Sequence, residues 1–297
     1  MELLVGLRDS HAAHCGKYVP QVLHRSLRDW LAGSIGEGRV AQSGFLWRGS
    51  LGRQAERLRT VQLFFEFAGT SIDYYQGWPP LSGLDGSVLI DDTSASIWLE
   101  RATLFGSRVD HVSAEARLSE AGQMLLDLDG RVSGPAGDAL AVINGSMLRE
   151  SLGDAFVGWR LAGELRSDLQ LRLNLSDQSV PPVVAVETLW KGVKLQTDDG
   201  LAVAGINGEL GFSSARGLSS KGLAGLLWGR PVTARVSQAP SRPGATYDPA
   251  RSPVVIDLAA TPAMADLRRW LDLEPLALAR GRTQVVARLS IPPDAPA

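Results

Sequence analysis

Apolar and polar residues alternate along much of this chain, and the period is two. The clearest case is a run of four leucines separated by Gln, Arg and Asn, over residues 169–175. Successive side chains of a β-strand point to opposite faces of a sheet, so this pattern predicts strands with one apolar and one polar face. Shorter runs, with glycine-containing turns between them, predict a mostly antiparallel sheet. The apolar positions are Val61, Leu63, Phe65, Phe67, Val88, Ile90, Ile97, Leu99, Leu169, Leu171, Leu173 and Leu175.

Helical spacing is confined to three places. The first holds Leu23, Leu27, Trp30 and Leu31 on one stripe, and the second covers roughly residues 138–152. The third is expected to begin with Thr261 as the N-cap and Pro262 at the first helical position, the two residue types that favour those sites. Three short helices are therefore expected among many strands.

The predicted helices share a pattern that recurs about every 120 residues, at 27–31, 148–152 and 267–271. A Gly-Leu-Asp-Gly turn at 83–86 is similarly matched by Gly-Ile-Asn-Gly at 205–208. The sequence thus predicts an N-terminal segment (1–19), two repeats of a helix followed by strands (20–137 and 138–260) and a truncated third repeat (261–297).

A sheet must bury its apolar side, and three short helices are too few to cover so many strands. One solution is a closed sandwich or barrel, in which the sheet folds onto itself around a filled core. The other is a curled, open trough that holds something apolar. The expected fold class is mainly β: an elongated, curled antiparallel sheet with an open groove, built from repeats of about 120 residues that each carry a short helix. Alternation alone leaves both solutions open.

Composition excludes several classes of protein. With 44% hydrophobic and 21% charged residues, the chain has enough apolar surface to fold. Its 30 basic residues are balanced by 32 acidic residues, which argues against nucleic-acid binding, since that binding depends on a basic face. No apolar run is long enough to span a membrane, so the chain is either cytoplasmic or carries its targeting signal on sequence beyond this segment.

Candidate chemistry is sparse. His11, His14 and Cys15 are soft metal ligands close together, but no second Cys/His pair could complete a site, so no metal is expected. Asp110 and His111 resemble an acid–base pair, yet adjacent strand residues should face opposite ways. No nucleophile elbow is present. We therefore expect no catalytic residue, no cofactor and no enzymatic activity.

The order of motifs from 27 to 236 resembles the AsmA-like, YhdP-type proteins of the Gram-negative envelope. The carrying motifs are the 27–31 helix leading into Phe-Leu-Trp-Arg-Gly at 45–49, the Tyr-Tyr-Gln-Gly-Trp-Pro-Pro-Leu run at 74–81 before the 83–86 turn, and the 149–152 segment leading to the leucine strand. Two stretches, 2–16 and the proline-rich 240–253, do not fit the pattern.

The resemblance implies a segment of a periplasmic, bridge-like protein, anchored in the inner membrane by a transmembrane helix outside this segment, whose β-groove carries phospholipid toward the outer membrane. Envelope proteins are a further class of partner. The alternative is a non-catalytic structural or scaffolding β-domain, in which the same residues form a closed core and strand edges bind other proteins. The residues expected to line the groove are Val61, Leu63, Phe65, Phe67, Ile97, Leu99, Leu169, Leu171, Leu173 and Leu175.

Overall fold

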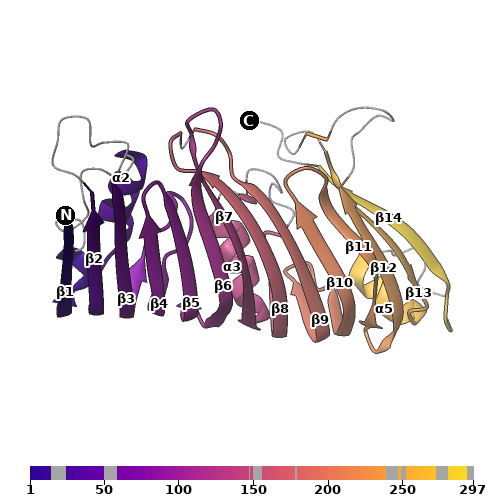
Figure 1. The fold of residues 1–297 in the computed structure, drawn as a ribbon. Helices are drawn as coiled ribbons and strands as arrows, with labels where there is room; N and C mark the ends of the chain where they lie inside the picture. Colours follow the sequence, from indigo (N-terminus) through magenta and orange to yellow (C-terminus); the bar gives the residue numbers. More distant parts are fainter. Residues whose placement is uncertain are drawn as a thin grey trace. The chain divides into compact units, whose positions relative to one another are not determined.

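A computed structural model describes residues 1–14, 25–49, 59–146, 148–149, 156–177, 179–238, 247–248, 252–271 and 280–292. These residues form an antiparallel sheet whose fourteen strands follow one another in chain order from β1 to β14 (Figure 1). The mainly β, antiparallel fold class predicted from alternation is confirmed. The strands are β1 (Glu2–His11), β2 (Arg39–Arg48), β3 (Thr60–Ile72), β4 (Leu81–Asp91), β5 (Ser94–Leu104), β6 (Ser107–Leu118), β7 (Met124–Pro135), β8 (Trp159–Asn174), β9 (Val183–Thr197), β10 (Ala202–Ser213), β11 (Gly217–Leu227), β12 (Arg230–Gln238), β13 (Val254–Ala260) and β14 (Val285–Ile291).

Short helices interrupt the strands at the places where helical spacing occurs. They are α2 (Arg25–Ser34), α3 (Ala136–Gly145) and α5 (Met264–Leu271), with a 3₁₀ turn, η1 (Ala12–His14), after β1. None of the described helices has the length and apolar character needed to cross a membrane.

Two helix boundaries differ from the prediction. The third helix begins at Met264, so Thr261 and Pro262 precede it without capping it; instead Ala263 forms a β-bridge with Arg282. The second ends at Gly145 rather than continuing unbroken to 152, and residues 148–149 are again helical after Ser146, whose hydroxyl accepts a hydrogen bond from the Leu148 amide at 3.2 Å. A serine that bonds the backbone ahead of it starts a new turn and interrupts the old one.

The chain divides into two compact units. Unit 1 contains residues 1–132 and 169–183, and unit 2 contains residues 133–168 and 184–297. These units differ in extent from the predicted repeats, whose boundaries stay a prediction.

In unit 1, α2 and the loop after it contact one end of the sheet. Ile35 forms a β-bridge with Ile72 at the end of β3, and the Trp30 indole Nε1 donates a hydrogen bond to the Tyr74 carbonyl at 3.0 Å. Leu31 is buried on the same helix. Trp30 and Leu31 of the predicted stripe therefore pack α2 on the protein, whereas Leu23 lies outside the described residues.

In unit 2, α3 supplies apolar cover for the strands. Leu140 of α3 is buried in a cluster with Leu218 of β11, Val236 of β12 and Val254 of β13. A second cluster gathers Ala136 at the start of α3 with buried residues of the first part of β8, β9 and β10. The Trp228 ring, at the β11–β12 turn, lies 5.9 Å from the Trp270 ring of α5.

A kink in neighbouring strands occurs in both units. In unit 1, Gly69 has a φ of 63° and its amide donates to Asp85 Oδ1 at 2.8 Å; in unit 2, Gly192 has a φ of 65° and its amide donates to Asn207 Oδ1 at 3.0 Å. Pairing shifts register at both kinks, as expected for β-bulges. The prediction of turns at 83–86 and 205–208 was wrong, because both segments lie inside strands, β4 and β10. Each supplies a side-chain oxygen that accepts the glycine amide of its kink, a carboxylate oxygen from Asp85 and an amide oxygen from Asn207.

Candidate functional site: the apolar face of unit 1

One face of the unit 1 sheet is apolar across consecutive strands. Residues directly paired in an antiparallel sheet point to the same side, so a row of pairs traces one face. Phe65 of β3 pairs with Val88 of β4, Val88 pairs with Ile97 of β5, and Ile97 pairs with Ala114 of β6. A parallel row runs from Leu63 through Ile90 and Ala95 to Ala116. We call this side the apolar face of unit 1.

The apolar face continues onto the second part of β8, the strand that carries Leu169, Leu171 and Leu173. The polar side chains of this part of β8 show which way its leucines point. Arg172 Nε contacts Asp127 Oδ1, and Arg117 contacts the other oxygen of the same carboxylate at 2.8 Å. Because Leu171 and Leu173 flank Arg172, they point to the other side of the sheet. The Leu175 amide donates to the Met124 carbonyl at 2.8 Å, which joins this strand to β7.

The structure brings the ten predicted lining residues into one unit. Those on β3 and β5 share one face by register, and the leucines of β8 point away from the polar pair described above. Ile97 and Leu169 are half-buried. The other eight are buried: Val61, Leu63, Phe65, Phe67, Leu99, Leu171, Leu173 and Leu175.

Part of the same face is exposed at β1. Val5 pairs with Phe45 and Phe45 pairs with Leu63, so these three side chains point the same way. On β1 the exposed fractions are 52% for Leu3, 41% for Val5 and 40% for Leu7. The apolar face therefore changes from buried on β3 to solvent-accessible on β1.

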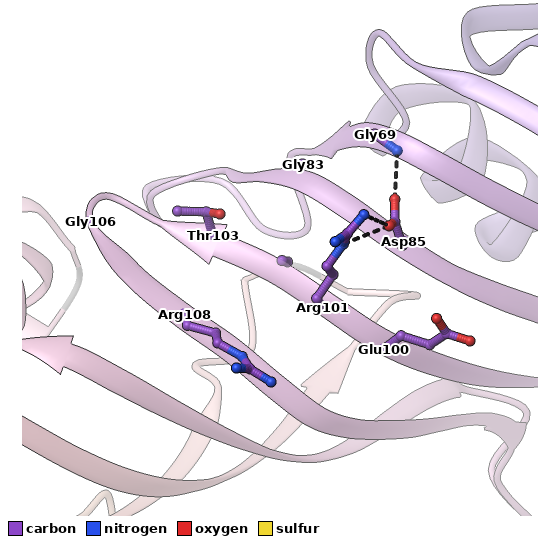
Figure 2. Close-up of a pocket in the computed structure, with 9 residues that line it drawn as sticks. Gly69, Gly83, Asp85, Glu100, Arg101, Thr103, Gly106 and Arg108 are labelled. Carbon is purple, nitrogen blue, oxygen red and sulfur yellow. Dashed lines mark hydrogen bonds and ion pairs between the residues drawn. The ribbon is translucent and has the colours of Figure 1, made fainter.

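The polar face of unit 1 carries a pocket of about 970 Å³, shown in Figure 2, at the bulges of β3, β4 and β5. Asp85 lines the pocket: Oδ1 accepts from the Gly69 amide, and Oδ2 accepts from Arg101 Nε at 2.6 Å. The Gly69 hydrogen bond and the Arg101 guanidinium lower the pKa of Asp85 below its ordinary value. Arg108, also in the pocket, is bound to Asp110 at 3.0 Å. Both cations have carboxylate partners, so the pocket is a polar network that fixes the bulges.

A second pocket, of about 560 Å³, lies in unit 1 between α2, the segment after β3 and the end of β8. Trp30, Tyr74 and Tyr75 contribute rings to its lining, and Asp29 and Asp73 contribute carboxylates. We call it the Trp30 pocket. Burial raises the pKa of Tyr74 and, together with the charge of Asp177, that of Tyr75, so both rings stay neutral.

The remaining sequence candidates do not assemble into a reactive centre among the described residues. The rings of His11 and His14 lie 6.1 Å apart, and Cys15 is outside the described part of the chain, in which no group of metal ligands occurs. Asp110 and His111 are closer than alternation predicts: His111 has a φ of 52°, which places its Nε2 3.9 Å from Asp110 Oδ1. His111 is exposed, and the ion-pair partner of Asp110 is Arg108 at 3.0 Å, so the two residues do not form an acid–base pair.

Sequence analysis missed part of the apolar face. Val112, Ala114 and Ala116 of β6 alternate with polar residues and are buried, but two of them are small and their alternation was overlooked. The exposed β1 residues were missed because residues 1–19 were not assigned to the sheet. No pattern in the sequence indicated the Trp30 pocket, because the segments that form its walls are distant from one another in the sequence.

Comparison with known protein families matches residues 1–296 to the family described as YhdP protein. The chain belongs to the YhdP family. This is an envelope family of the bridge-like lipid-transport type, and it is not an enzyme family. The match includes residues 2–16 and 240–253, which the sequence pattern had left outside the resemblance, and 2–11 are indeed the first strand of the sheet. No curated protein matches the chain, and no solved structure does.

Proposed function

We propose that this YhdP-family chain is a segment of a periplasmic protein, anchored in the inner membrane, that shields phospholipid acyl chains in a β-groove during transport between the inner and outer membranes. The apolar face of unit 1 is the surface on which the chains lie. The observation that carries the proposal is the unbroken row of apolar pairs across β3 to β6, which offers an acyl chain the same environment from strand to strand.

The energetics suit this role. Each CH₂ group removed from water contributes about 0.8 kcal/mol, so about ten buried groups contribute on the order of 8 kcal/mol. No directional bond is needed, and a lipid can therefore move along the face without breaking specific contacts. The half-buried Ile97 and the exposed β1 residues give such a chain a surface to contact before any side chain moves.

A second candidate function is supported by the burial of eight of the ten lining residues by the chain's own atoms. Phe65 and Phe67 stack on each other at 5.9 Å, as side chains of a filled core do. On this account the chain is a non-catalytic structural domain of the envelope, and its apolar face is a dry core that excludes lipid.

Lipid extraction separates the two candidates. The full-length protein is purified from membranes in a mild detergent, and bound phospholipid is quantified by mass spectrometry against an envelope protein of similar size purified in the same way. The transport proposal predicts at least one phospholipid per protein chain after extensive washing. Phospholipid at the level of the control protein would favour the structural domain.

A further inference from the structure

The Trp30 pocket has walls of two kinds. Its aromatic lining residues are Trp30, Tyr74 and Tyr75, and its acidic lining residues are Asp29 and Asp73. The hydrogen bond from Trp30 Nε1 to the Tyr74 carbonyl at 3.0 Å fixes the indole against the segment after β3. The described residues that line the pocket include neither Lys nor Arg. Such a site favours a cation, because ring faces and carboxylates both attract positive charge.

The two carboxylates are available to a ligand. Asp73 is exposed, and among the described residues its side chain has no ion-pair or hydrogen-bond partner; its backbone amide alone is bound, to the Ser34 carbonyl at 2.8 Å. Asp29 Oδ2 lies 3.4 Å from Arg25 Nε, and the Asp29 and Arg25 side chains are 67% and 85% exposed. An ion pair in that setting is weak and is easily exchanged for another cation.

The pocket also adjoins the apolar face of unit 1. Leu175 lines the pocket and is itself one of the buried leucines of that face. Its amide is bound to Met124, a residue with no exposed surface at the start of β7. A ligand whose cationic end occupies the pocket can therefore extend an apolar tail past Leu175 onto the face.

We infer that the Trp30 pocket binds the ammonium headgroup of an aminophospholipid whose acyl chains lie on the apolar face of unit 1. This inference rests on the proposed function and names the lipid class that unit 1 prefers. The rings of Trp30 and Tyr74 contact the ammonium group, and Asp73 and Asp29 neutralise its charge. Phosphatidylglycerol, an anionic lipid whose headgroup carries no cation, makes neither contact.

Competition between two lipids tests the inference. The full-length protein is incubated with equal amounts of phosphatidylethanolamine and phosphatidylglycerol that carry identical acyl chains, and the bound ratio is read by native mass spectrometry. We expect the ethanolamine lipid to be enriched roughly three- to ten-fold, the range for one exposed ion pair combined with one cation–π contact. Asp73→Lys should abolish this enrichment or reverse it in favour of phosphatidylglycerol.

The matched control is Glu2→Lys, which makes the same change of charge at an exposed residue. Glu2 pairs with Arg48 at the end of β2 farthest from α2, so this variant should keep the wild-type ratio. Asp73 has no side-chain partner among the described residues, and both variants should fold. Equal binding of the two lipids by the wild type, or an unchanged ratio in Asp73→Lys, would overturn the headgroup assignment and leave the lipid-transport proposal intact.

Two further outcomes distinguish the sources of the ligand. Glycerophosphoethanolamine carries the same headgroup without acyl chains, and we expect that at lipid concentrations it does not displace the bound lipid. Displacement would identify a free small amine as the ligand and overturn the assignment to a lipid. Failure of the protein to bind either lipid would overturn the proposed function together with this inference.

Discussion

At the residue scale, the leucine strand provides the sharpest contrast between the two faces. Leu171 has 4% of its surface exposed, whereas its neighbour Gln170 is exposed. We predict that Leu171→Glu lowers the amount of co-purified phospholipid several-fold, because a carboxylate on the apolar face costs several kcal/mol when acyl chains cover it. Gln170→Glu introduces the same carboxylate on the opposite face and should retain wild-type lipid.

Circular dichroism must first show that both variants are folded. If Leu171→Glu is unfolded, Leu171→Ala replaces it, since this variant shortens the same side chain without adding a charge. Equal loss of lipid from the variants at 170 and 171 would contradict the assignment of the face.

The contribution of Asp85 to the stability of the fold depends on pH. Its folded-state pKa is lowered, first by the Gly69 amide and then by Arg101, so its stabilising effect is present above the ordinary carboxyl pKa of about 3.9 and is lost as the pH falls through the lower, folded-state value. Asparagine keeps the acceptor for Gly69 and loses the ion pair. We expect Asp85→Asn to cost about 1 kcal/mol of unfolding free energy at pH 7 and less than this below pH ~4. Urea denaturation at several pH values measures this difference, and a cost independent of pH would rule out the ionised carboxylate as its origin.

At the element scale, alternation was sufficient to find β3, β4, β5, β8 and β13, and helical spacing was sufficient to find α2. The exact helix starts were not predictable from residue preferences. Thr261 and Pro262 are a favourable start by preference, but the β-bridge at Ala263 competes for the same backbone and moves the helix start to Met264. Alternation also fails locally at the bulges, because one extra residue reverses which positions face inward. Leu99 and Ala102 of β5 are both buried although they are three positions apart in the sequence.

The bulge of β4 depends on glycine at one position. A Cβ placed on Gly86 would lie 2.4 Å from the Trp98 carbonyl oxygen and 3.0 Å from the Leu99 Cα. We predict that Gly86→Ala destabilises the protein by about 2 kcal/mol, because β5 must move away from β4. Gly44→Ala, on β2, meets nothing within 4 Å and should change stability by less than about 0.5 kcal/mol. Thermal unfolding compares the two variants, and equal effects would show that β5 accommodates the methyl group without cost.

At the scale of the whole molecule, the proposed function rests on the family and on the apolar face together. No reactive centre was expected from the sequence, and the YhdP family is not an enzyme family. The apolar face could be predicted in part, because leucine and phenylalanine alternation is visible in the sequence. The alternation of β6 is also visible in the sequence but was overlooked, because two of its apolar residues are alanines. The Trp30 pocket could not be predicted, since it depends on contacts between distant segments.

The central claim is that phospholipid acyl chains lie on the apolar face of unit 1. Site-specific photocrosslinking tests it most directly, with p-benzoylphenylalanine introduced at Ile97 or at Trp98 of the full-length protein in living cells. These adjacent residues of β5 face opposite sides; Ile97 is half-buried on the apolar face, and Trp98 is 48% exposed on the polar face. The account predicts that irradiation attaches phospholipid at position 97 and little or none at 98. Lipid attached equally at both positions, or at neither, would contradict it.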